Sequence, residues 1–81
     1  MSAQDILHEI MQMAMDYTRP GYQISAHFIG YIGTFAVSIT RDDETDWLTS
    51  FAGDAFDAET MRRIKADLFT HHEQFRHKQA A

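Results

Sequence analysis

Residues 22–40 read YQISAHFIGYIGTFAVSIT, and the alternation of apolar and polar side chains in this stretch decides the fold. From Tyr22 to Phe28, every second side chain is apolar and those between them are polar. A period of two is typical of a half-buried β-strand, and residues 35–39 repeat it. Glycines at both ends of residues 30–33 interrupt the alternation and predict a hairpin turn.

The segments that flank this hairpin have helical or further strand periodicity. Residues 3–17 carry apolar side chains at helical spacing, behind an N-cap expected at Ser2. Residues 58–77 carry a second apolar stripe, with an N-cap expected at Asp57 or Asp54.

A third strand and a polar turn complete the predicted elements. Residues 47–52 alternate like the first two strands, and Gly53 with Asp54 ends them. Residues 41–44 are polar and predict a turn between the second and third strands.

The order helix, strand, strand, strand, helix predicts a two-layer α+β domain. In this arrangement a three-stranded antiparallel sheet carries both helices on one face. Residues 1–81 contain no linker and no internal repeat, so we expect one small α+β domain. The apolar residues expected to form its core are Ile10, Ile24, Phe28, Phe35, Val37, Ile39, Ile64 and Leu68.

The composition narrows the class of protein. The chain has 81 residues, of which 44% are hydrophobic and 23% charged, which is typical of a globular domain rather than a disordered one. It contains no cysteine, which excludes disulfides, thiolate zinc sites and cysteine nucleophiles. No secretory signal or membrane-spanning pattern is visible, so a cytoplasmic location is the default expectation.

Charge is segregated along the chain, beneath a net charge of −5. The expected acidic surface consists of Asp42, Asp43, Glu44, Asp46, Asp54 and Asp57. The expected basic surface consists of Arg62, Arg63 and Lys65. Acids before a helix and bases further along it match the helix dipole, and the same layout could steer a partner.

The histidines near the C-terminus invite a metal hypothesis that their spacing does not support. His72 and His77 are five residues apart, which places them about 140° apart around a helix, so they do not converge on one ion. We expect these histidines to be solvated. No nucleophile, phosphate-binding loop or carboxylate pair stands out either, so the sequence predicts no enzyme, no catalytic residue, no metal and no cofactor.

The predicted hairpin turn is unusually apolar. Turns normally carry Asn, Asp or Ser, whereas this one includes Ile29, Tyr31 and Ile32. Either the strands extend into the turn, or a helix or a partner covers it. Met13 and Met15 lie at the margins of the first helix and are further candidates for a partner-binding surface, although core filling is the favoured interpretation for the methionines.

Three functions are compatible with these features. The leading hypothesis is a non-enzymatic protein-interaction or regulatory module that binds a partner protein or a second copy of itself. The second is a small acidic inhibitor of a nucleic-acid-binding enzyme. In size and character only, the chain resembles short phage- or prophage-encoded accessory proteins, such as inhibitors of CRISPR or restriction enzymes.

The third hypothesis is a nucleic-acid binder that uses the basic start of the last helix. The predicted element order is similar to that of double-stranded-RNA-binding domains. However, the first helix exposes Asp5, Glu9 and Asp16, where phosphate binding requires positive charge. The sequence therefore disfavours a nucleic-acid partner.

Overall fold

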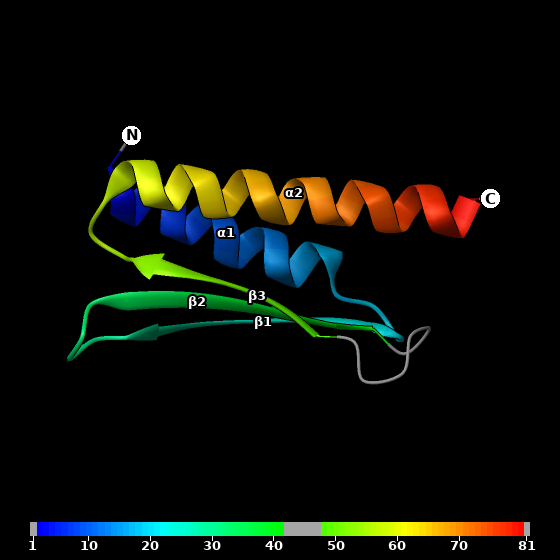
Figure 1. Ribbon diagram of the computed structural model, residues 1–81, viewed down its shortest axis with the longest axis horizontal. Helices are drawn as coiled ribbons and strands as arrows, with labels where there is room; N and C mark the ends of the chain where they lie inside the picture. The colour runs from blue at the N-terminus through cyan, green and yellow to red at the C-terminus, as the bar shows by residue number, and fades with distance from the viewer. Residues whose placement is uncertain (1, 42–47, 81) are drawn as a thin grey trace.

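The computed structural model describes residues 2–41 and 48–80, and its elements follow the predicted order. They are α1 (Ala3–Tyr17), β1 (Tyr22–Ile29), β2 (Thr34–Arg41), β3 (Leu48–Asp54) and α2 (Ala58–Ala80). The strands form one antiparallel sheet in the order β1-β2-β3, and both helices cover one of its faces (Figure 1). The predicted two-layer α+β fold is confirmed.

The β1–β2 hairpin forms where the alternation predicts it. Its register runs without a bulge from the pair Tyr22–Arg41 to the pair Ile29–Thr34. Residues 30–33 make the turn, and the amide of Gly33 donates to the carbonyl of Gly30 at 3.3 Å. Gly33 has a φ of +67°, a conformation that glycine adopts without steric cost.

Side-chain caps fix the start of each helix. The Ser2 hydroxyl and the Asp5 carboxylate each accept the other residue's backbone N–H, which makes a capping box at α1. Of the two candidate caps for α2, the structure uses Asp57, whose carboxylate accepts the N–H of Thr60 at 3.1 Å. The α2 helix continues to Ala80, beyond its predicted end at residue 77.

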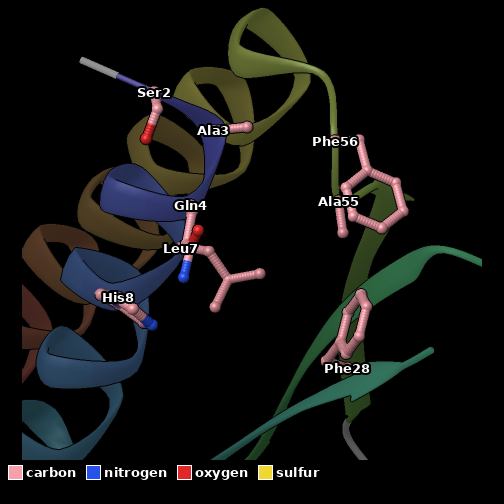
Figure 2. A pocket seen from close by; sticks show the side chains of 8 residues that line it. All are labelled: Ser2, Ala3, Gln4, Leu7, His8, Phe28, Ala55 and Phe56. Atoms are coloured by element: carbon pink, nitrogen blue, oxygen red, sulfur yellow. The ribbon is translucent and has the colours of Figure 1, made fainter.

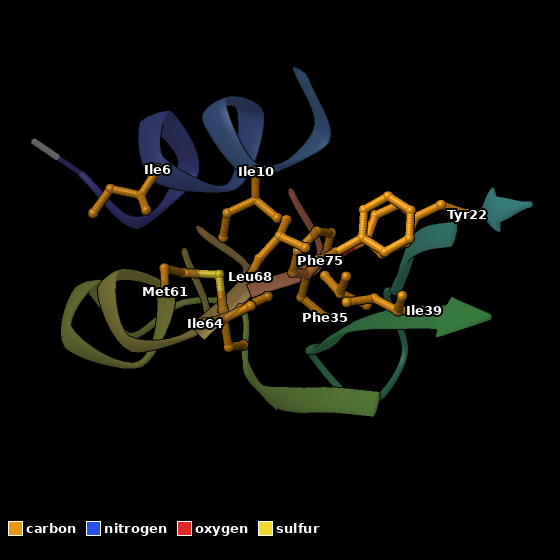
Figure 3. Packing of buried hydrophobic residues seen from close by; sticks show 11 residues of the cluster. Ile6, Ile10, Tyr22, Phe35, Ile39, Met61, Ile64, Leu68 and Phe75 are labelled. Carbon is orange, nitrogen blue, oxygen red and sulfur yellow. The ribbon is translucent and has the colours of Figure 1, made fainter. Parts of the chain in front are cut away.

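The core lies between the sheet and the two helices (Figure 3). Six of the predicted core residues are buried, namely Ile10, Phe35, Val37, Ile39, Ile64 and Leu68. Ile24 is only half-buried but packs against the same cluster. Phe28 is 48% exposed, so its prediction as a core residue is wrong. Phe28 lies near the turn end of β1, where an open cleft separates it from the first two turns of α1.

The facing of α1 differs from the prediction for one methionine. The helical spacing of apolar residues 3–17 also allows Met11 in the core stripe, but Met11 is 42% exposed, whereas Met13 packs against the core. The buried face of α1 is centred near Ile10, and at about 100° per residue Met13 lies about 60° from it and Met11 about 100°. The angular position of the stripe's centre therefore explains the difference.

Two polar residues that were predicted outside the core are buried. Arg41, predicted in a turn, ends β2 on its inner face, and its guanidinium carbon lies 5.1 Å from the centroid of the Phe75 ring. His72, predicted to be solvated, is buried because it follows Leu68 by four residues and precedes Phe75 by three. Both residues therefore lie at positions that face the core by the periodicity of β2 and α2, although their side chains are polar.

The α1–β1 connection bonds to part of the outer edge of β1. Arg19 and Tyr22 exchange two backbone hydrogen bonds of 2.9 Å. The Thr18 hydroxyl accepts the N–H of Ile24 at 3.2 Å and donates to the carbonyl of Ala14 at 2.7 Å. The edge nearest the connection is thus paired without a fourth strand.

Neither helix, within the described residues, combines the length and apolarity that crossing a bilayer requires.

Candidate functional site

Four large apolar side chains lie exposed at the hairpin-turn end of the molecule. The exposed fractions are 48% for Phe28, 91% for Tyr31, 56% for Ile32 and 72% for Phe56. We call these four residues the apolar tip. Tyr31 and Ile32 were predicted to bind a partner, and they occupy the two central positions of the turn. Ile29, predicted with them, is half-buried at the end of β1.

The β3–α2 connection brings Phe56 to the turn. The amide of Ala55 donates to the carbonyl of Gly33 at 2.8 Å, and the amide of Phe56 donates to the Asp54 carboxylate at 2.9 Å. The Phe56 ring then meets Phe28 edge to face, with 6.0 Å between the ring centroids. It also lies over Gly33, where an added Cβ would be 2.9 Å from the Phe56 ring.

Phe56 is the functional candidate that the sequence analysis missed. It stands between Asp54 and Asp57, a polar context that predicts only a turn and a helix cap. One signal was present, because an apolar residue directly before an N-cap commonly packs on the helix's first turns. Phe56 is instead mostly exposed, so a packing role within its own helix does not account for it.

An open cleft of about 560 Å³ separates the apolar tip from α1 (Figure 2). Gln4, Leu7 and His8 line its α1 side, and Phe28 and Phe56 line the opposite side. A second hollow of about 610 Å³ lies beside Tyr31 and Ile32, and Phe56 borders this one too. Phe56 therefore lies between two concave surfaces.

The two methionines predicted at the helix margin differ in exposure. Met13 is half-buried against the core, which agrees with core filling. Met15 is 74% exposed on α1 and lines neither of the two hollows beside the apolar tip.

The structure describes only part of the predicted acidic surface. Asp42, Asp43, Glu44 and Asp46 lie outside the described residues. Asp54 and Asp57 both accept local hydrogen bonds, and the one from the Thr60 hydroxyl holds the pKa of Asp57 below its usual range.

The structure separates the three predicted basic residues. The Lys65 ammonium lies 2.6 Å from a carboxylate oxygen of Glu9, so it joins α2 to α1. Arg62 and Arg63 are exposed, and they border a hollow that Asp57 and Glu59 also border. Positive and negative side chains therefore mix on this surface.

A cluster of aromatic rings and histidines joins the C-terminal halves of the helices to β1. Tyr22 is fully buried, and its hydroxyl lies 3.2 Å from Nδ1 of His71. Burial raises the pKa of Tyr22 to about 12. His72 stacks on Tyr17 with 3.7 Å between the ring centroids, and burial lowers the pKa of His72.

This cluster corrects the prediction of solvated histidines for His71, which is half-buried, and His72, which is 4% exposed, whereas His77 is exposed as predicted. Among the described residues, no three histidine, aspartate or glutamate side chains converge in a way that could hold a metal ion. The contacts seen here join α1, β1 and α2, which is a structural role.

No protein-family model, curated protein or solved structure matches the chain. Folds of this size and class carry many unrelated functions, so the architecture alone assigns none. Function is therefore inferred from the apolar tip and the surfaces around it.

Proposed function

We propose that this chain is a non-enzymatic protein-interaction or regulatory module of the cytoplasm that binds a partner protein through the apolar tip. The observation that carries the proposal is the joint exposure of Phe28, Tyr31, Ile32 and Phe56 at one end of the molecule. Together they expose roughly 500 Å², in the upper part of the range for the largest apolar patch on a monomer. Such patches commonly mark interaction sites.

The chemistry of the apolar tip supports the same proposal. Aromatic residues with a polar group, such as Tyr31, are favoured at the centres of protein interfaces. The rim carries polar side chains, including Gln4, His8 and Asp54, which can form hydrogen bonds at the edge of a contact. The hollows on either side of Phe56 can accept side chains of a partner.

The two other hypotheses gain less support from the described residues. Of the carboxylates on which an acidic inhibitor would depend, Asp54 and Asp57 are engaged in local hydrogen bonds. For a nucleic-acid binder, Lys65 is paired with Glu9 across the helices. Among the described residues, Asp57 and Glu59 border the same hollow as Arg62 and Arg63, so both signs of charge mix there, and we favour the apolar tip.

Affinity capture with three immobilised proteins tests the proposal. They are the wild type, the tip variant Tyr31→Ala/Ile32→Ser, and a control variant Thr70→Ala/Gln74→Ala with two exposed positions changed on α2. Extracts of the native host are passed over each, and bound proteins are quantified by mass spectrometry. Circular dichroism confirms that each variant is folded.

We expect the wild type and the control to capture a common partner. The amount captured by the tip variant should fall at least about tenfold, which corresponds to about 1.4 kcal/mol of binding free energy. Equal capture by a folded tip variant would overturn the proposal.

A further inference from the structure

The hairpin-turn end of the molecule carries both a projection and a hollow. Tyr31 and Ile32 project from the turn, with 91% and 56% of their surfaces exposed. The cleft between α1 and the ring of Phe28 lies at the same end and is open to solvent. A surface with both features can complement itself, because a two-fold axis brings each projection to the other copy's hollow.

We propose that the partner of the apolar tip is a second copy of this chain, with Tyr31 of each copy seated in the cleft of the other. This inference rests on the proposed function and names its partner. The cleft volume of about 560 Å³ is large enough for a tyrosine side chain and part of its neighbour. Leu7 and the rings of Phe28 and Phe56 give the cleft the apolar walls that an aromatic ring requires.

The area available approaches the lower limit for a specific interface, about 600 Å² per partner. The apolar tip alone contributes roughly 500 Å² per copy, and a standard interface takes about 800 Å² from each partner. The cleft walls on α1, from Gln4, Leu7 and His8, supply further area when Tyr31 enters. A stable interface must therefore cover both the projection and the hollow, and a two-fold pairing covers both on each copy.

The distribution of charge allows a second copy to approach this surface. Each chain carries a net charge of −5, so two copies repel wherever their acidic side chains meet. Neither the apolar tip nor the lining of the cleft contains Asp, Glu, Lys or Arg. Two like-charged chains can therefore approach at this end with no charged side chain in the contact itself, and with the Asp54 carboxylate only at its rim.

The shape of the molecule leaves room for this pairing. The hairpin turn lies at one end of the long axis, which measures 38 Å (Figure 1). Contact through that end keeps the C-terminal part of α2 away from the partner copy. The resulting dimer is elongated, with a length close to twice the 38 Å of one copy.

Analytical ultracentrifugation of two complementary variants tests the proposal. Tyr31→Ala/Ile32→Ser removes the projection, and Gln4→Trp fills the cleft from an exposed rim position. Thr70→Ala/Gln74→Ala is the control, and circular dichroism confirms folding in each case. We expect the wild type and the control to be dimers, and each tip or cleft variant to dissociate at least about tenfold more readily.

Mixing the two variants gives the sharpest outcome. A chain without the projection still has a cleft, and a chain with a filled cleft still has Tyr31. The mixture is therefore expected to associate more strongly than either variant alone, since one of the two contacts is restored. A mixture no stronger than its components would overturn the seating of Tyr31 in the cleft.

The results also separate this inference from the proposed function. A wild type that stays monomeric up to about 1 mM would overturn the dimer, while a captured protein lost by the tip variant would leave the proposed function standing. Dimers that persist in the tip variant, together with unchanged capture, would overturn both.

Discussion

Substitution of Gly53 by alanine is expected to destabilise the fold, because β3 and α2 approach most closely there. Gly53 pairs with the buried Phe35 in the sheet, and a Cβ added to it would clash with Cγ2 of Thr60. Thr60 cannot easily move away, since its N–H and its hydroxyl both bond to the Asp57 carboxylate that caps α2. The φ of Gly53 is not positive, so packing rather than backbone strain determines the effect.

The magnitude follows from these contacts. Overpacking a close contact costs about 1–3 kcal/mol, and shifting Thr60 to relieve it weakens a cap worth about 1 kcal/mol. The smaller conformational entropy of unfolded alanine offsets about 0.4–1 kcal/mol. We expect a net loss of about 1–3 kcal/mol in the free energy of unfolding, which lowers the Tm of a domain this size by about 5–20 °C.

Urea denaturation followed by far-UV circular dichroism measures the loss. Gly30→Ala is a matched control, because its Cβ would meet only the half-exposed ring of Phe28, at 3.3 Å, and that ring can swing aside. Thr60→Ser keeps the hydroxyl bond to Asp57 and removes Cγ2, so Gly53→Ala/Thr60→Ser should regain most of the lost stability. If Gly53→Ala is as stable as the wild type, or the double variant is no better than the single one, the close approach of α2 to β3 is refuted.

Three further predictions concern the core, the pH dependence and metals. Leu68→Ala and Val37→Ala should each lower the free energy of unfolding by about 2–4 kcal/mol, and unchanged thermal midpoints would contradict the core assignment. Burial lowers the pKa of His72 below its usual value of 6.5. As the pH falls below about 6.5, His72 therefore takes up a proton in the unfolded chain before it does so in the folded one. Stability should therefore decrease there, as thermal melts across pH would measure, and His72→Gln should flatten that dependence; an identical slope in the variant would refute this account. Dialysis against a strong chelator should leave the circular-dichroism spectrum and melting curve unchanged, and a large drop in stability would contradict the prediction of no metal.

The sequence predicted the elements of this fold well because each element keeps a strict period. The alternation from Tyr22 to Phe28 and the glycines of residues 30–33 locate the hairpin. The cap at Ser2 and the cap at Asp57 depend only on neighbouring residues, so they too could be found.

Burial was harder to predict, because it depends on how far one element covers another. Phe28 has the correct facing, but α1 leaves a cleft beside it. Arg41 and His72 also stand at inward-facing positions of their elements, but polar side chains are usually predicted to be exposed. Aromatic partners make their burial possible, since the guanidinium of Arg41 lies over Phe75 and His72 stacks on Tyr17.

The candidate site was predicted in part for the same reason. Tyr31 and Ile32 stand out in sequence because they are apolar in a turn. Phe56 joins them through the backbone bond between Ala55 and Gly33 and its ring contact with Phe28, both of which link residues far apart in the chain. Periodicity carries no information about such a contact.

The paired outer edge of β1 limits how this protein can aggregate. The eight residues of β1 include no charged residue and no proline. On an edge strand, these residues usually prevent pairing with a strand of another molecule. Arg19 and Thr18 serve that purpose instead, by bonding to Tyr22 and Ile24. A strand that docked there could pair only with the remainder of the edge, near Ala26 and Phe28. That ladder is shorter than the six or seven residues typical of a fibril-forming segment, so one threonine and a tight turn restrain amyloid-like growth from this edge of the sheet.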